Sequence, residues 1–458
     1  MVRKAIGVGI ISILVTLASG ASARAETLTD ALISSYKNSG LLDQNRALLR
    51  AADEDVAQAV ANLRPVLNYV LSSSYSSLAD RAPLSDGVSA NLELSANFLL
   101  YDFGRSRLGI DVAKENVLAL REALVGIEQN VLLRAVSAYV GVQRDISIVD
   151  LRNSNVRLIT QELRAARDRF EVGEITRTDV SLAEARLAAA QSGLAVAIGN
   201  LDISREEYRA AVGRYPDNLA PLPTTPVTAS SQDAALSVAR QRHPDILQAQ
   251  RNVTVADLSI ALANAVMRPN ISGSASVGVD RDGQDSHRLG VTLSGPIYAG
   301  GALAAAERAA AARRDASLAV LHLTRIAVDQ NVGNAWARLK VASAAIQASD
   351  QQIRAATVAF QGVREEAALG ARTTLDVLNA EQELLDARAS RISATSDRYI
   401  AIYNLLAAMG LLTVDHLKLG IVTYDASAYY NAVKAAPSYR VSPQGDKLDR
   451  VLKSIGKN

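Results

Sequence analysis

The 458-residue chain contains no cysteine, which excludes disulfide bonds, thiolate metal sites, a cysteine nucleophile and a lipid-anchored N-terminal cysteine. Aromatic residues are also scarce, at 4% of the chain, whereas hydrophobic residues of all kinds reach 49%. Small and aliphatic side chains therefore supply most of the apolar surface, which favours closely packed helices over a thick globular core. The formal net charge of +2 gives no reason to expect nucleic acid as a partner.

Residues that carry catalysis are few and dispersed. The four histidines lie on different predicted elements without metal-ligand spacing: His243, His287, His322 and His416. No glycine-rich phosphate loop is present, and Gly300 and Gly301 are interpreted as a joint between a strand and a helix. The neighbouring acids Glu365 and Glu366 are interpreted as part of a solvated helix face. The sequence therefore predicts no enzyme, no cofactor and no bound metal.

The N-terminus carries an export signal. Arg3 and Lys4 precede an apolar run over residues 5–18, and Ala23-Arg24-Ala25 is a small-x-small cleavage motif. A membrane anchor is the weaker interpretation, because the run is shorter than the roughly 20 residues that a spanning helix needs. We expect residues 1–25 to be a cleaved signal peptide, and no later segment of spanning length lacks charge.

The rest of the chain is duplicated. Residues 173–187 and 370–384, which lie 197 positions apart, are identical at seven of 15 places. Tyr101 and Tyr298 each lie 72 residues before the first glycine of these segments, so the repeat extends well beyond them. The sequence then divides into a first repeat at 26–212, an equatorial linker at 213–233 with four prolines, a second repeat at 234–409, and an equatorial C-terminal segment at 410–458 that ends in a loose tail.

Each repeat has the same predicted order of elements. Short helices come first, followed by a strand hairpin at about 66–100 or 270–298, a long helix at 105–170 or 302–367, a tip at 171–176 or 368–373, and a return helix at 176–212 or 373–409. No proline interrupts the long helices, whose 66 residues at 1.5 Å per residue make rods of roughly 100 Å. Their apolar residues recur every three or four positions, which predicts coiled-coil-like packing.

The strand hairpins alternate apolar and polar residues, the period of a strand with one wet face. Each of the four strands has about ten residues, the length of a tilted membrane-spanning strand. An exposed sheet in a soluble protein is the alternative. Four strands cannot close, and open sheet edges are not tolerated in lipid, so several copies of the chain must pool their strands. Two copies give a filled barrel and three give a pore, and the pattern leaves that number open.

Several short motifs occur in a specific order and spacing. They are Arg-Pro before each strand pair at Pro65 and Pro269, Tyr-Asp-Phe-Gly at 101–104, and the tip patterns around Gly173 and Gly370. Together with the export signal and the duplicated halves, they resemble the TolC family of outer-membrane efflux proteins over residues 28–409. The resemblance implies a homotrimer in the outer membrane, with a twelve-stranded β-barrel embedded in lipid and an α-barrel of long helices in the periplasm. It also implies docking to a periplasmic adaptor and an inner-membrane pump, either a resistance-nodulation-division pump or an ABC transporter.

The same resemblance assigns roles at the tips. It places gate links between the helix pairs on Asp179 and Arg372, and a lumen-facing acidic ring on Asp376. Three such carboxylates around one axis repel, which raises the pKa of each and attracts cations. Residues that form the tip turns and offer an adaptor docking surface are Val172, Gly173, Thr176, Leu369, Gly370 and Thr373, with the glycines turning the chain and the threonines capping the return helices.

Two positions depart from the family pattern. Where the type member carries a second ring aspartate, this chain has Asn379, and Ala367 replaces a gate tyrosine. We therefore expect easier opening and weaker cation blockade than in the type member.

Two other classes of protein are compatible with parts of the sequence. A periplasmic coiled-coil structural protein predicts release without detergent and no pore in bilayers. A general diffusion porin needs many more strands per chain and does not explain helices of roughly 100 Å. The exported substrate is not readable from the sequence.

Overall fold

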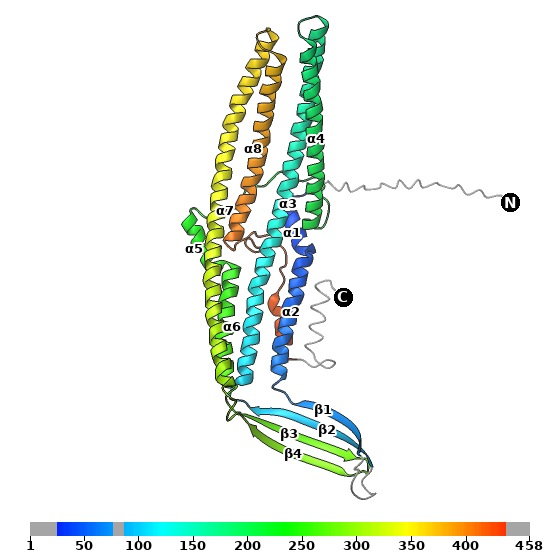
Figure 1. The fold of residues 1–458 in the computed structure, drawn as a ribbon, viewed down its shortest axis with the longest axis vertical. Helices are drawn as coiled ribbons and strands as arrows, with labels where there is room; N and C mark the ends of the chain where they lie inside the picture. Colours follow the sequence, from blue (N-terminus) through cyan, green and yellow to red (C-terminus); the bar gives the residue numbers. More distant parts are fainter. Residues whose placement is uncertain (1–24, 77–86, 437–458) are drawn as a thin grey trace, which may run out of the picture.

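The computed structural model describes residues 25–76 and 87–436, which form a long rod of helices with a sheet at one end (Figure 1). Residues 1–24 of the predicted signal peptide and 437–458 of the predicted tail lie outside the described residues. Within the described ranges, no helix combines the length and the apolar character that crossing a membrane requires. The long axis thus runs from two helical tips to the sheet, with the short helices midway or near the sheet.

The two halves repeat one order of elements. The first half contains α1 (Leu28–Asn38), α2 (Gly40–Ala61), β1 (Val66–Ser76), β2 (Gly87–Tyr101), α3 (Arg105–Glu171) and α4 (Arg177–Val212). The second contains α5 (Gln232–Arg242), α6 (Pro244–Ala265), β3 (Asn270–Asp280), β4 (Asp285–Ser294), α7 (Ala302–Ala368) and α8 (Thr374–Ala408), and α9 (Ala426–Val433) follows. This confirms the prediction of a mainly helical tandem repeat with four strands in the chain.

The strand-to-helix joints depend on left-handed backbone. Phe103 and Gly104 have φ values of 52° and 87°, and Gly300 and Gly301 have 58° and 85°. Two successive left-handed residues reverse the chain sharply, so that each long helix starts at the end of the sheet. In the first half, the Asp102 carboxylate stabilises the joint by accepting hydrogen bonds from the backbone N–H groups of Gly104 and Ser106.

The long helices α3 and α7 have 67 residues each, which corresponds to about 100 Å. α4 returns along α3 and α8 returns along α7, so the rod ends in two helical hairpins (Figure 1). Their buried positions are often alanine, for example Ala183 and Ala190 on α4 and Ala356 on α7. Small side chains let the helix axes approach closely, as the low aromatic content predicts.

The sheet is antiparallel throughout, in the order β1-β2-β3-β4. Its register brings most apolar residues of the four strands to one face, which Asp285 and His287 of β4 share: Leu67, Tyr69, Leu71, Leu92, Leu94, Ala96, Ala275, Val277, Val279, Leu289, Val291 and Leu293. The opposite face carries mostly polar residues: Asn68, Ser72, Ser74, Ser89, Asn91, Glu93, Ser95, Ser274, Ser276, Arg288 and Thr292. One face therefore suits lipid and the other water.

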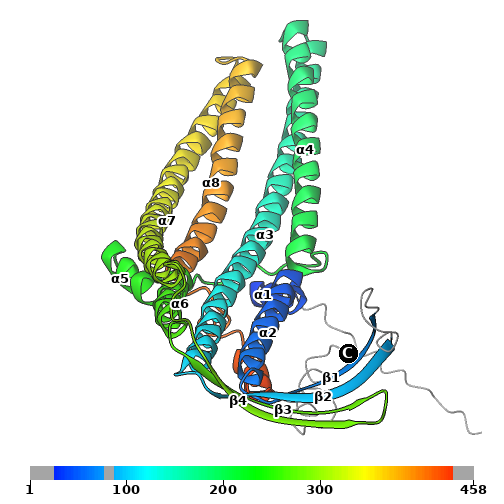
Figure 2. The ribbon, with the colours of Figure 1, turned by 60° about the horizontal axis from the view of Figure 1, so that its bottom comes forward.

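The outer edges of β1 and β4 carry no strand partner within the described residues. The sheet curves beneath the helices (Figure 2). Leu71 on β1 and Leu289 on β4 are 73% and 82% exposed in the single chain. Such long apolar edge strands are prone to pair with strands of another chain.

The main core lies midway along the rod, where α1, α3, α4 and α8 meet. Glu26, which precedes α1 and is 9% exposed, lies at the border of this core. One carboxylate oxygen of Glu26, Oε1, accepts hydrogen bonds from the Tyr208 hydroxyl and from the Arg214 Nη2 atom, both at 2.6 Å. The Tyr139 hydroxyl lies 2.6 Å from the Ala220 carbonyl oxygen and 3.0 Å from that of Glu26. This network fixes the segment before α1 and the linker between the halves to α3 and α4.

Candidate functional site

The two hairpin tips have the same backbone geometry. Gly173 and Gly370 have φ values of 79° and 78°, which favour glycine. In the first tip, the Gly173 N–H donates to the Phe170 carbonyl, and the next N–H donates back to Arg169. This is the Schellman arrangement that satisfies the last carbonyls of a helix. The second tip repeats this arrangement. The Gly370 N–H donates to the Ala367 carbonyl, and the Ala371 N–H donates to the Glu366 carbonyl.

The return helices begin with matched capping boxes. The Thr176 hydroxyl accepts from the Asp179 N–H, while an Asp179 carboxylate oxygen accepts from the Thr176 N–H at 3.0 Å and from its hydroxyl at 2.8 Å. Thr373 and Asp376 repeat this with the same two distances. Both aspartates assigned to the gate therefore also hold the first turn of a helix.

Arg372 interacts with two acids at the second tip, Glu366 and Asp376. Its Nε atom donates to a carboxylate oxygen of Glu366 at 2.8 Å, and both side chains are about half exposed. The structure thus brings Arg372 to Glu366 within the chain and shows no ion pair between Arg372 and Asp179 among the described residues. Hydrogen bonds from Thr373, and secondarily the Arg372 charge, hold the pKa of Asp376 below its usual range.

Apolar side chains flank the tips on the outside. Val172 is 71% exposed and Leu369 is 86% exposed, and each is the C-cap residue of its long helix. Exposed aliphatic side chains at equivalent positions of two hairpins form a repeated surface that another protein can cover.

The two hairpins also contact each other below the tips. Leu378 of α8 is 1% exposed and packs among residues of α3 and α4, while Leu158 of α3 packs against the cluster between α7 and α8. A buried polar link crosses the same contact, in which Asn155 Nδ2 donates to Glu381 Oε1 at 2.7 Å. Their exposures are 7% and 3%.

Two further polar links cross this contact near the surface. Arg186 of α4 donates to the Asn379 side-chain oxygen on α8 at 2.8 Å, and Arg364 of α7 lies 3.6 Å from Glu162 of α3. Asn379 is thus held by α4.

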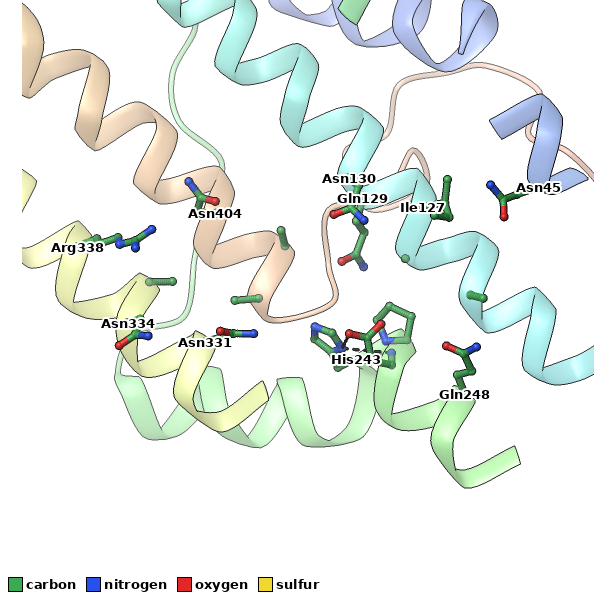
Figure 3. A pocket seen from close by; sticks show the side chains of 17 residues that line it. Asn45, Ile127, Gln129, Asn130, His243, Gln248, Asn331, Asn334, Arg338 and Asn404 are labelled. Carbon is green, nitrogen blue, oxygen red and sulfur yellow. Dashed lines mark hydrogen bonds and ion pairs between the residues drawn. The ribbon is translucent and has the colours of Figure 1, made fainter. Parts of the chain in front are cut away.

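A polar pocket of about 510 Å³ lies midway along the rod, where α2, α3, α6, α7 and α8 meet (Figure 3). Seven carboxamide side chains line it: Asn45, Gln129, Asn130, Gln248, Asn331, Asn334 and Asn404. His243 lies at the α5–α6 junction beside the pocket, and burial lowers its pKa. The charged residues Asp245 and Arg338 also line it. The pocket suits hydrogen bonding to water or polar solutes.

Among the described residues, no group of three or more histidine, cysteine, aspartate or glutamate side chains is arranged to hold a metal ion.

The sequence interpretation missed Glu381 and the partner of Arg372. Glu381 follows the buried residues Val377 and Leu378 at helical spacing and precedes Leu384. A charged residue in that apolar stripe was the available signal. Glu366, which the sequence predicts to be solvated, is half exposed and also forms an ion pair with Arg372.

Comparison with known proteins agrees with this architecture. The family model described as outer membrane efflux protein matches residues 34–214 and 235–411, one match in each repeat. The outer membrane efflux protein BepC of Brucella suis is 34% identical over 427 residues, covering 92% of this chain and 93% of BepC. The outer membrane protein TolC of Vibrio cholerae is 26% identical over 406 residues, covering 85% and 92% of the two chains.

Solved structures support the fold. The Campylobacter jejuni CmeC outer membrane channel superposes with a TM-score of 0.76 at 15% identity, covering 90% of each chain. The open state of the Neisseria gonorrhoeae MtrE outer membrane channel gives a TM-score of 0.73 at 22% identity, covering 85% of this chain and 90% of MtrE. Because the family model matches both repeats and BepC matches nearly end to end, the chain belongs to the outer membrane efflux protein family of passive, non-enzymatic outer-membrane channels.

Proposed function

We propose that three copies of the chain form the outer-membrane exit duct of a tripartite efflux or type I secretion system. The observation that carries this proposal is the two-faced sheet with free edges on β1 and β4. Pairing β4 of one copy with β1 of the next closes a barrel without edges, as lipid requires. Three copies supply twelve strands, enough to leave a water-filled pore, whereas eight strands leave an interior filled by side chains.

The helical hairpins would then hang into the periplasm as a tunnel. Helices of about 100 Å reach far below the membrane and place the tips within reach of an inner-membrane pump. We assign docking of a periplasmic adaptor to the exposed Val172 and Leu369 together with the turns they flank. The adaptor would in turn bind an inner-membrane pump, either a resistance-nodulation-division pump or an ABC transporter.

The test is to size the detergent-solubilised protein and record it in planar bilayers. A trimer mass with discrete conductance steps is expected. A monomer released from cells without detergent, and silent in bilayers, would support the structural coiled-coil alternative instead.

Within this duct we propose that Arg372 and Asp179 link neighbouring hairpins in the closed state, with Asp376 facing the lumen. Arg372 then exchanges its Glu366 partner for Asp179 when the copies come together. Because the guanidinium is half exposed, the link is weak and a docking partner can break it.

Removing the gate charges is expected to raise the conductance of the closed channel several-fold. The variants are Arg372→Ala and Asp179→Asn, the second of which keeps an oxygen for the Thr176 cap. Arg167→Ala is the matched control, because Arg167 forms an equally exposed ion pair with Glu184 inside one hairpin. Single-channel recording at low voltage measures the effect. If Arg372→Ala, Asp179→Asn and the control all have the same conductance, Arg372 and Asp179 do not hold the channel closed.

A further inference from the structure

The contact between the two hairpins has a titratable group at its centre. Glu381 is 3% exposed, and its only hydrogen bond in the described residues comes from Asn155 to Oε1. Its other carboxylate oxygen, Oε2, is buried and has no hydrogen-bond partner there. Burying an ionised carboxylate with half of its acceptors unused is costly, so this contact favours the neutral carboxyl group.

Charged groups of α3 and α4 lie near Glu381 without pairing with it. The Glu162 carboxylate on α3 disfavours a second negative charge, whereas Arg186 on α4 favours it. Both are engaged elsewhere, because Arg186 donates to Asn379 and Glu162 lies 3.6 Å from Arg364 of α7. Neither arginine forms an ion pair with Glu381 among the described residues.

The position of Glu381 connects this group to the tips. It lies eight residues after Thr373, the N-cap of α8, or about 12 Å along the helix. It also lies one turn from Leu378, the α8 side chain that is buried between α3 and α4. A change at Glu381 therefore acts on the apolar contact that keeps one hairpin against the other.

We propose that Glu381 is a gating residue that holds the α7–α8 hairpin against the α3–α4 hairpin when protonated and loosens that contact when ionised. This inference rests on the proposed function, because it gives the contact a role in opening the tunnel. It adds a proton-controlled link that is separate from Asp179, Arg372 and Asp376.

The direction of the pH effect follows from the burial. Desolvation raises the pKa of Glu381 from 4.5 to about 7, with a further contribution from Glu162 and opposition from Asn155 and Arg186. Glu381 binds its proton more tightly when the hairpins are packed than when they are separated. The stability of the contact is therefore greatest below pH 4.5 and falls as the pH rises to about 7. A difference of this size favours packing of the protonated form on the order of 100-fold.

The first experiment compares conductance across pH for the full-length protein in bilayers. Wild-type protein is expected to open increasingly between pH 4.5 and 7, whereas Glu381→Gln stays closed across this range. Glu383→Gln is the matched control, because it removes an exposed carboxylate two residues away on the same helix, and it should follow the wild type. Asn155→Asp adds a second buried carboxyl group to the contact, which disfavours packing once it is ionised, and should move the opening transition to lower pH.

The second experiment measures the contact itself, by amide hydrogen exchange of α8 peptides in the purified protein. At each pH the variants are compared with the wild type, which cancels the intrinsic pH dependence of exchange. Exchange near Leu378 should be faster in the wild type than in Glu381→Gln at pH 8 and equal at pH 4. Identical pH profiles of wild type and Glu381→Gln in either measurement would overturn the proposal. A wild type that forms no pore would instead overturn the proposed function, and exchange would still test the contact.

Discussion

Replacing Leu71 with lysine is expected to abolish stable insertion into the outer membrane, whereas replacing its neighbour Ser72 with lysine leaves insertion intact. Leu71 is the sixth of eleven residues in β1, so it lies at the middle of the strand. It belongs to the apolar face and is directly opposite Leu92. Ser72 points to the other face and is opposite Asn91.

The physical reason is the medium that each face meets. A lysine on the lipid face near the bilayer midplane costs about 2–4 kcal/mol, and a trimer carries three of them, or ~6–12 kcal/mol. That sum matches the whole net stability of many folded proteins. A lysine at position 72 meets water in the pore and changes only the conductance and ion preference.

Membrane fractionation of producing cells provides the measurement, with resistance to urea extraction as the criterion for integral insertion. The two variants add the same charge to adjacent residues, so each controls for the other in expression and export. Equal insertion of both would show that the apolar face of the sheet does not face lipid.

The second large effect is expected for Gly410→Ala, which should destabilise the folded protein by about 3 kcal/mol or more. Gly410 ends α8 with φ of 75°, a conformation that costs an alanine roughly 1–2 kcal/mol. A Cβ atom there would also lie 2.8 Å from the carbonyl oxygen of Arg242 and from the Cα atom of His243. These backbone atoms join α5 to α6 and cannot move without disturbing the adjoining core.

Gly370→Ala is the matched control for this prediction. Gly370 has nearly the same φ, 78°, but a Cβ atom there meets nothing within 4 Å. Gly370→Ala therefore carries only the cost of the left-handed backbone, whereas Gly410→Ala adds the steric clash. Thermal unfolding of the two purified variants separates these two contributions. Equal unfolding temperatures for the two variants would mean that the α5–α6 junction yields to the added methyl group.

The elements of this fold were largely predictable because the sequence repeats them. The helix periodicity and the absence of proline predicted the long helix at residues 105–170, and α3 ends one residue later. The left-handed glycines at the tips and the alternating strands are equally local signals. Each depends on neighbours in sequence, so no tertiary information was needed.

Contacts between distant segments were not predictable in the same way. Glu26 meets Tyr208 across 182 positions, and Asn155 meets Glu381 across 226. Such pairs depend on which faces of the helices meet, and a polar residue in an apolar stripe signals burial without naming its partner.

Asp179 and Asp376 each have two roles assigned to them, one in the gate and one in a helix cap. The family resemblance assigns their charge to a gate, whereas the structure gives each carboxylate a local task within Thr-x-x-Asp. The cap explains why both repeats keep the acid, whereas the arginine directly before the capping threonine, Arg372, occurs only in the second tip. Charge-removing variants at these sites must therefore preserve the cap before their effect on conductance can be assigned to the gate.

The open edges of β1 and β4 also determine the order of assembly. A lone chain would expose unpaired backbone to lipid at both edges, and two chains would form a barrel without a pore. Insertion and oligomerisation must then be a single event, with a rate that rises steeply with the concentration of exported chains. At low expression we expect this protein to accumulate as unassembled chains in the periplasm, and the membrane to contain complete channels without partial ones.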